Sequence, residues 1–368
     1  MSRSQNINIP FTDLYSQYKE LKKDIDNSIT EIITNSDFLT GKTVEKFEQS
    51  ICNYTKSESC ASVSSGTMAL ICALRALNIG KNDKVITVGH TFISTTESIL
   101  SVGAKPIFVD IDKYFHLDIK KLKYYKNTKA ILFVDLYGQT PDIDKLKRFA
   151  KKHNLYLIED AAQSFGSSYK GKKVGNLVDL TCFSFNPIKN LGAMGDAGAV
   201  TGRKKLINKV KMFRDHGRHN SMYKEIGYQG RIDNIQAVII ENKLKKLDQW
   251  IEKKIKICRR YTKYLKHIVK TPEETSWSKH TYYAYVIETP INTRNKLKKY
   301  LLNNGISTNI NYREPTHLFN SSIKLPKTEY VCNNILSLPC YHSLTINQQD
   351  YIINKIKEFY INEKNITS

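Results

Sequence analysis

Residues 130–158, AILFVDLYGQTPDIDKLKRFAKKHNLYLI, hold the pattern that decides the fold. An unbroken apolar run opens the stretch, a charged segment with helical spacing follows at 143–153, and a second apolar run ends it at 155–158. Strands that are buried on both faces lose the alternation of apolar and polar residues, and parallel neighbours need a crossover, usually a helix. The stretch therefore predicts two parallel strands joined by a helix.

The same alternation continues on both sides of this unit. Further short apolar runs predict strands, and a segment with helical spacing at 95–101 predicts one of the helices between them. The further predicted strands are Lys84–Val88, Pro106–Val109, Leu180–Phe185 and Ala199–Thr201. We expect an α/β fold with a large, mostly parallel sheet that is covered by helices on both faces. Ligands of such sheets bind beyond the carboxyl ends of the strands.

Helical spacing dominates both ends of the chain. Helices are predicted at 12–34, 43–55, 67–80 and 346–360. Residues 243–270 carry apolar side chains three, four or seven positions apart among many lysines and arginines, as on one amphipathic helix with solvated basic faces. The change from alternating strands and helices to long basic helices predicts a large domain over residues 1–245 and a smaller C-terminal α+β domain over residues 246–368.

The composition narrows the classes of function. Apolar residues make up 40% and charged residues 25%, which is typical of a soluble globular protein. No apolar stretch reaches the roughly 20 residues of a membrane-spanning helix, and no signal segment opens the chain, so we expect a cytoplasmic protein without membrane contact. The formal charge of +22 favours anionic substrates, because no nucleic-acid-binding motif accompanies it. Cysteine and histidine spacing predicts no metal site.

The first of three chemical motifs is a run of small residues. Ser64, Ser65, Gly66 and Thr67 precede a predicted helix. Small residues let backbone N–H groups approach an anion, and the partial positive charge of a helix N-terminus favours phosphate. Alone, the motif favours an ordinary helix N-cap, in which Ser65 or Thr67 pairs with free backbone N–H groups.

The second motif is an acid at the end of a strand. Asp160 follows the apolar run 155–158, at the edge of the sheet where ligands are expected to bind. Its carboxylate could hold a protonated ring nitrogen. Position alone does not select it, because Asp110, Asp112 and Asp135 also lie near predicted strand ends.

The third motif places Lys189 between an apolar strand and the glycine-rich stretch 192–200. Most lysines are solvated, but a lysine in a partly buried crevice has a lowered pKa and can form a Schiff base. Ser184, five residues earlier, could reach the phosphate of the same ligand. A phosphate cradle, an acid for a pyridinium and such a lysine are together the binding set of pyridoxal 5'-phosphate.

With these motifs the chain resembles the DegT/StrS sugar aminotransferases, which have the type I (aspartate aminotransferase-like) fold of pyridoxal phosphate enzymes. The resemblance covers nearly the whole chain and implies a transaminase. Dehydratases of this family carry histidine where this chain has Lys189. The matching stretches are FLTGKTVEKFEQ (38–49), VSSGTMAL (63–70), HTFIST (90–95), FVDID (108–112), LYGQ (136–139), IEDAAQSFG (158–166), FSFNPIKNLGAMGDAGAV (183–200), DHGR (215–218) and SLPCY (337–341).

The resemblance implies a role for each residue that matches a family motif. Lys189 matches the Schiff-base lysine, and Asp160 matches the partner of the pyridinium nitrogen, which selects it among the strand-end acids. Gln163 matches the residue near the ring hydroxyl. Phe92 matches the aromatic residue that stacks on the cofactor ring; without the resemblance, a core phenylalanine is a fair alternative. The matching phosphate ligands are Gly66, Thr67 and Ser184.

Two segments depart from the family pattern. At 226–233 (IGYQGRID), Gln229 stands where the family usually has an asparagine that reaches the cofactor phosphate from the neighbouring subunit. The resemblance still implies a homodimer with shared active sites. At 309–320 (NINYREPTHLFN) the family often has His-Tyr-Pro near the sugar, so Tyr312 and His317 are the candidate substrate-binding residues.

The implied reaction transfers the amino group of L-glutamate to a nucleotide-linked keto-sugar. The stretches 9–21 and 38–48 are more similar to family members that aminate C3 than to those that aminate C4. HTFIST favours a dTDP-3-keto-6-deoxyhexose, whereas 159–172 is similar to the UDP group too, which leaves a UDP-linked 3-keto or 4-keto sugar as the alternative. The rival of another class is a non-catalytic regulatory or binding member, against which Lys189 weighs.

Overall fold

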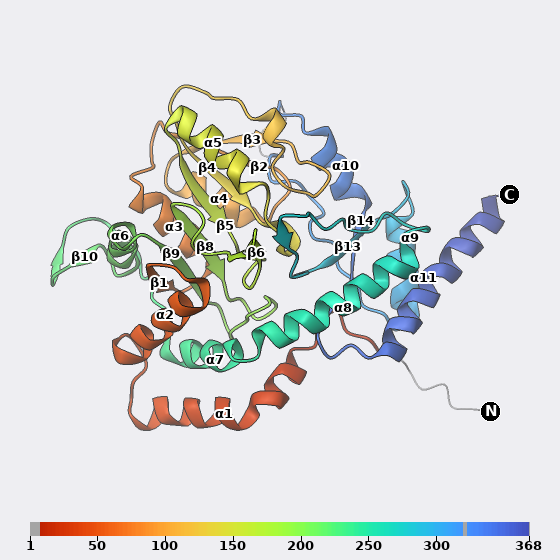
Figure 1. The fold of residues 1–368 in the computed structure, drawn as a ribbon, viewed down its shortest axis with the longest axis horizontal. Coiled ribbons are helices and arrows are strands. Elements are labelled where there is room, and N and C mark those ends of the chain that lie inside the picture. The colour runs from red at the N-terminus through yellow and green to blue at the C-terminus, as the bar shows by residue number, and fades with distance from the viewer. Residues whose placement is uncertain (1–7, 319–321, 368) are drawn as a thin grey trace.

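The computed structural model describes residues 8–318 and 322–367, and a seven-stranded sheet lies at its centre (Figure 1). Its strand order is β1-β9-β8-β5-β4-β2-β3. Five neighbouring strands are parallel, and the next, β9, is antiparallel to both β8 and β1. The predicted mostly parallel sheet is confirmed. The strands are β1 (Ser59–Val63), β2 (Lys84–Val88), β3 (Lys105–Val109), β4 (Thr128–Val134), β5 (Tyr156–Asp160), β8 (Leu180–Ser184) and β9 (Gly198–Gly202).

The predicted unit at the centre of the chain is confirmed as β4, α5 (Ile143–His153) and β5. Asp142 caps α5 by accepting a hydrogen bond from the backbone N–H of Lys145, and Asn154 ends the helix in the left-handed conformation. The strands pair in register, so that Val134 lies beside Asp160. A polar residue thereby ends β5 at the carboxyl edge of the sheet.

Helices cover both faces of the sheet because neighbouring residues of each strand point to opposite sides. Along β4, Ala130 and Leu132 belong to the apolar core beneath α3, α4 and α6, whereas Ile131 and Phe133 belong to the core on the other face. The helices of the first face are α3 (Gly66–Ala76), α4 (Ile93–Ser101) and α6 (Lys204–Arg214). On the other face lie α2 (Gly41–Thr55), α5 and α7 (Asn234–Leu244).

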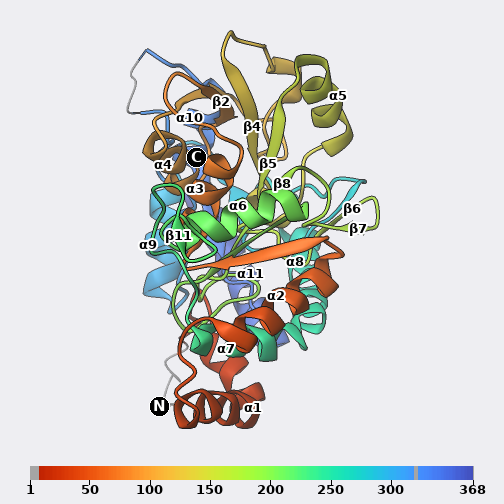
Figure 2. The same cartoon turned by 90° about the vertical axis from the view of Figure 1, so that its left-hand side faces the viewer.

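The N-terminal helix α1 (Leu14–Thr34) packs outside this core. Figure 2 shows it below α7, and Leu21 and Ile25 form a small cluster with Ile239 and Trp250. Ahead of the helix, Ile9 pairs with Ile306 in a parallel bridge. The first described residues therefore join the C-terminal part of the chain.

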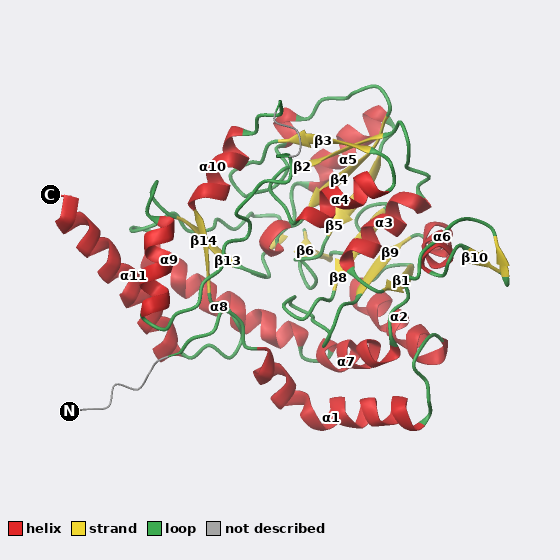
Figure 3. Ribbon diagram, turned by 180° about the vertical axis from the view of Figure 1, so that it is seen from behind, coloured by secondary structure: helices red, strands yellow, loops and turns green. Residues whose placement is uncertain are grey.

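A second, two-stranded sheet lies in the C-terminal part, where β13 (Tyr285–Glu288) pairs antiparallel with β14 (Ile335–Leu338). Figure 3 shows α9 and α11 beside this sheet. The proposed domain boundary at 245/246 stays a prediction. The remaining helices are α8 (Leu247–Leu265), α9 (Arg294–Asn303), α10 (Pro326–Asn334) and α11 (Ile346–Thr367), and the short strands are β6 (Ser168–Tyr169), β7 (Lys172–Lys173), β10 (Arg218–His219), β11 (Met222–Tyr223) and β12 (Ser278–Lys279).

Two expectations are corrected by the structure. The single helix predicted over 243–270 is two helices, α7 and α8, which are separated at Lys245–Lys246, and α8 ends at Leu265. The spacing of apolar residues continues across the junction, so periodicity does not reveal the break. The sequence pattern also missed β1, whose residues SCASV are mostly small. Within the described residues, no helix has the length and apolarity needed to cross a membrane.

Candidate active site

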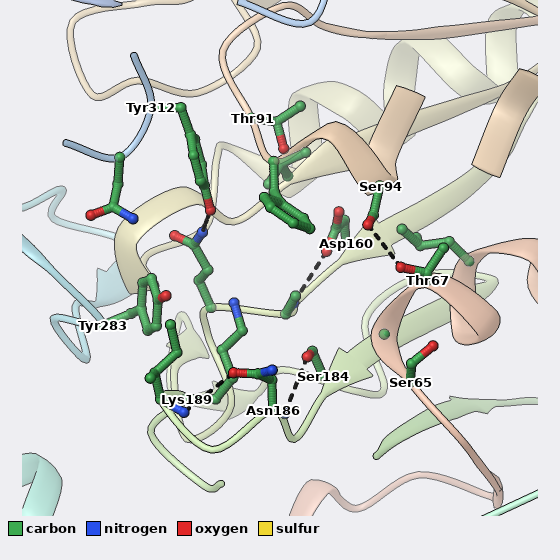
Figure 4. A pocket seen from close by; sticks show the side chains of 18 of the residues that line it. Ser65, Thr67, Thr91, Ser94, Asp160, Ser184, Asn186, Lys189, Tyr283 and Tyr312 are labelled. Carbon is green, nitrogen blue, oxygen red and sulfur yellow. Dashed lines mark hydrogen bonds between the residues drawn. The ribbon is translucent and has the colours of Figure 1, made fainter. Parts of the chain in front are cut away.

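A pocket of about 620 Å³ opens at the carboxyl ends of β2, β4, β5 and β8 (Figure 4). It lies at the edge of the sheet where the sequence predicted a ligand site. The structure brings eight of the predicted site residues together in its walls: Gly66, Thr67, Phe92, Asp160, Gln163, Ser184, Lys189 and Tyr312.

Asp160 is the last residue of β5, and its side chain is buried, with 5% of the residue exposed. Oδ2 accepts a hydrogen bond from Thr95 Oγ1 at 2.8 Å, and Oδ1 accepts one from the backbone N–H of Ala162 at 3.2 Å. Burial raises the pKa of Asp160, and the hydrogen bond from Thr95 acts in the opposite direction. A buried carboxylate held in this way is stabilised by a cationic partner.

Lys189 lies in the loop between β8 and β9, and its amine stands 4.5 Å from the centre of the Tyr283 ring. Enclosure by protein atoms lowers the pKa of Lys189 to about 8, and the charge of Asp160 acts in the opposite direction. A larger share of the amine is therefore neutral near pH 7 than for a solvated lysine, and the neutral form is the nucleophile. Figure 4 shows the two groups in one pocket.

The start of α3 forms the opposite wall. Ser65 caps the helix by accepting a hydrogen bond from the backbone N–H of Met68, and Thr67 Oγ1 lies 2.7 Å from Ser94 Oγ. A Cβ at Gly66 would lie 2.7 Å from Ser184 Cβ, so glycine is needed for this close approach. Hydroxyl groups and a helix N-terminus on one side of a pocket provide a site for phosphate.

Gln163 and Tyr312 form the third wall. The backbone N–H of Tyr137 donates to Gln163 Oε1 at 2.7 Å, which fixes the orientation of the amide. Gln163 Nε2 donates to the hydroxyl of Tyr312 at 2.8 Å, and its second hydrogen can serve another acceptor. Phe92 is 52% exposed, which excludes the alternative of a core phenylalanine.

These residues fit pyridoxal phosphate. The α3 start and Ser184 can hold its phosphate, Asp160 its ring nitrogen, and the amine of Lys189 its aldehyde carbon. Two observations support this fit. The space between Gly66 and Ser184, where the phosphate would bind, is too narrow for a Cβ at residue 66. The buried Asp160 accepts hydrogen bonds but forms no salt bridge among the described residues, so its charge is available to the ring nitrogen. Across 8–318 and 322–367, no group of three or more histidine, cysteine or acidic residues could hold a metal ion.

Comparison with known proteins identifies the family. A model described as the DegT/DnrJ/EryC1/StrS aminotransferase family matches residues 19–357. The chain belongs to this family. It is a sugar aminotransferase that depends on pyridoxal phosphate, and the expected fold, enzyme class and cofactor are confirmed.

Proteins with different functional names are similar to the chain along almost its whole length. It is 38% identical to a "pleiotropic regulatory protein" of Geobacillus stearothermophilus, over 96% of this chain and 99% of the relative. It is 33% identical to the dTDP-3-amino-3,4,6-trideoxy-alpha-D-glucose transaminase of Micromonospora megalomicea subsp. nigra, over 93% and 96%. The crystal structure of DesV from S. venezuelae, in complex with a ketimine intermediate, superposes with a TM-score of 0.92 at 31% identity, over 96% and 98%.

Two predicted site residues of this aminotransferase lie outside the walls of the pocket. His317 is buried, with its Nε2 3.2 Å from Glu329 Oε1 and its ring beside Phe108. Gln229 is exposed, and its backbone pairs with that of Asp215 in an isolated antiparallel β-bridge. Their roles as ligands stay predictions. Phe319 and Asn320, the last residues of the stretch 309–320, lie outside the described residues.

The structure adds residues that the sequence did not single out. Thr91 and Ser94 line the pocket and Thr95 donates a hydrogen bond to Asp160, and all three lie within HTFIST, shortly after β2. Polar residues just beyond a strand end were the signal that could have found them. Tyr283 and Asn309 had no such signal, because packing of distant segments brings them to the pocket.

Proposed function

We propose that this aminotransferase moves the amino group of L-glutamate to C3 of a dTDP-linked 3-keto-6-deoxyhexose. The observation that carries the proposal is the presence of the Lys189 amine and the Asp160 carboxylate in one pocket. The similarity to the Micromonospora megalomicea transaminase and the motif HTFIST favour the dTDP-linked sugar. We place the enzyme in the cytoplasm, where its product would serve the synthesis of glycans such as lipopolysaccharide.

Lys189 and Asp160 have separate tasks in this reaction. Pyridoxal phosphate, when bound, supplies a ring that takes up electrons from the reacting carbon. The Lys189 amine is the base that removes a proton from the α-carbon of glutamate and later gives one to the sugar carbon. Asp160 keeps the ring nitrogen protonated by its negative charge. Glutamate leaves as 2-oxoglutarate after water has supplied its new oxygen.

The test of the substrate is a panel of nucleotide-linked keto-sugars. The panel holds dTDP- and UDP-linked sugars with the ketone at C3 or C4, and products are identified by mass and NMR. We expect amination at C3 of the dTDP-linked 3-keto-6-deoxyhexose. Preferred turnover of a UDP-linked 3-keto or 4-keto sugar would support the alternative that residues 159–172 leave open.

A regulatory member of the family is the second candidate, which the name of the Geobacillus stearothermophilus relative favours. Adding glutamate without any sugar distinguishes the enzyme from the regulatory candidate. An aminotransferase converts its bound cofactor with glutamate, so its visible absorbance disappears without any sugar, and Lys189→Ala abolishes the change. A holoprotein whose absorbance is unchanged by excess glutamate would support the regulatory candidate.

We further propose a homodimer in which each subunit completes the other's active site. Large apolar side chains lie exposed on and beside the β10–β11 hairpin: Met222, Tyr223 and Ile226, the last 86% exposed. Gln229 follows this hairpin and lies outside the pocket of its own chain. Sedimentation tests the dimer. Mixing inactive Lys189→Ala with a Gln229→Leu variant tests sharing, because mixed dimers regain one complete site.

A further inference from the structure

Residues 185–194, called the Lys189 turn below, fold back tightly around Lys189. The backbone N–H of Lys189 donates to the carbonyl of Asn186 at 2.9 Å, and that of Ala193 donates to the carbonyl of Phe185 at 2.7 Å. A Cβ at Gly192 would lie 2.3 Å from the carbonyl oxygen of Pro187. The course of this turn decides where the side chain of Lys189 begins.

Side chains of α7 and α8 form hydrogen bonds with Asn190, Gly192 and Met194, which follow Lys189 in the turn. Lys254 Nζ donates to Asn190 Oδ1 at 2.8 Å, and Lys243 Nζ donates to the carbonyl of Gly192 at 2.7 Å. The backbone N–H of Met194 donates to Gln236 Oε1 at 2.9 Å. The three contacts come from two helices and fix the turn from outside the pocket.

Lys243 is the unusual member of this group. It is 2% exposed, and among the described residues no salt bridge joins it to a carboxylate. Burial lowers the pKa of Lys243 to about 8. A methionine of similar length would avoid the cost of burying the amine, but it would leave the Gly192 carbonyl unpaired. What lysine specifically supplies here is a hydrogen-bond donor to the turn.

We propose that Lys243, Lys254 and Gln236 form a clamp on the Lys189 turn, and that Lys243 is a positioning residue for the transamination. It acts through the carbonyl of Gly192 and touches neither cofactor nor substrate. The clamp restricts the amine of Lys189 to the position in which it faces the pocket. Preorganisation of this kind lowers the ordering cost that cofactor binding would otherwise carry.

The test compares Lys243→Met with Lys245→Met in the holoprotein. Lys245 is exposed and bonds only to Asn242 among the described contacts, so it is a matched control. Loss of a hydrogen bond from a charged donor costs about 1.5–3 kcal/mol, which is a factor of about ten or more. We expect Lys243→Met to release the cofactor about tenfold faster. We expect a lower kcat with glutamate at an unchanged KM, and no change in Lys245→Met.

Two readouts separate positioning from a purely structural role. The first is the rise in melting temperature on adding pyridoxal phosphate, which should shrink in Lys243→Met because the ligand then binds more weakly. The second is the pH midpoint of the visible absorbance, which reports the surroundings of the Lys189 amine and should shift. Equal loss of melting temperature with and without cofactor, at an unchanged midpoint and release rate, would overturn the proposal.

Gln236→Leu provides an independent arm if Lys243→Met does not fold. It removes the acceptor for Met194 without leaving a buried charge, and we expect severalfold faster cofactor release with little change in the melting temperature of the cofactor-free protein. Release at the wild-type rate would show that the turn keeps its position without this contact, and the clamp would be wrong.

Discussion

Thr95 donates a hydrogen bond to Asp160 Oδ2 at 2.8 Å, and its hydroxyl also lies 2.8 Å from that of Thr91. Thr95 is fully buried at the start of α4, so this bond connects the segment after β2 to the end of β5. The bond opposes the effect of burial, which raises the pKa of Asp160. A side chain that does not itself line the pocket thus helps to keep the acid ionised.

Removing this hydroxyl should make the enzyme more sensitive to acid. In Thr95→Val the pKa of Asp160 rises further, and a larger fraction of the acid is neutral at any given pH. The loss of kcat/KM for glutamate should therefore be greatest at low pH, about tenfold, and should shrink as the pH rises. The pH profile of the glutamate half-reaction measures it. Thr95→Ser keeps the hydroxyl and should retain the wild-type profile.

The sequence predicts best those helices, strands and site residues that are determined by residues close to them in the chain. The strands β2 and β4 and the helix α5 have local apolar patterns, and α5 also has a local cap. Asp160 is the last residue of the buried strand β5, and Lys189 follows the buried strand β8 by five residues. The burial of Lys243 could not be predicted in this way. Its segment has the composition of a solvated basic face, but packing of α7 on the Lys189 turn encloses its amine. Tyr283 likewise reaches the pocket through the packing of distant segments.

The lowered pKa of Lys189 predicts how the cofactor-free protein captures pyridoxal phosphate. Only the neutral amine attacks the aldehyde, and its fraction increases as the pH rises through about 8. The rate of growth of the visible absorbance should therefore increase with pH and level off above that value. Lys189→Ala should show no such absorbance at any pH. A wild-type capture rate that does not vary across this range would contradict the assignment.

Gly66→Ala should weaken binding of the phosphate group selectively. The added methyl group would meet Ser184 Cβ at 2.7 Å, which forces the start of α3 and the end of β8 apart. We expect the Kd for pyridoxal phosphate to rise about tenfold or more, whereas the Kd for pyridoxal, which lacks the phosphate, changes little. Titration of the cofactor-free protein with both compounds checks this. Equal weakening for both would place the phosphate elsewhere.

A buried pair of acids beside Asp160 should make the folded protein less stable as the pH rises. Asp135 and Glu159 are fully buried, Asp135 Oδ1 and Glu159 Oε1 have no hydrogen-bond partner among the described residues, and burial raises the pKa of both acids. Two carboxyl groups can share a hydrogen bond only while one of them holds a proton. The stabilising contribution is present at low pH and is lost as the pH rises through the raised pKa values.

Asp135→Asn tests this pair because its amide can donate to Glu159 without titrating. We expect the free energy of unfolding of the variant to fall less steeply between acid and alkaline pH than that of the wild type, so that the variant gains relative stability at high pH. Urea unfolding of the cofactor-free protein at a series of pH values measures both curves. Parallel curves for the two proteins would mean that Asp135 and Glu159 hold no shared proton.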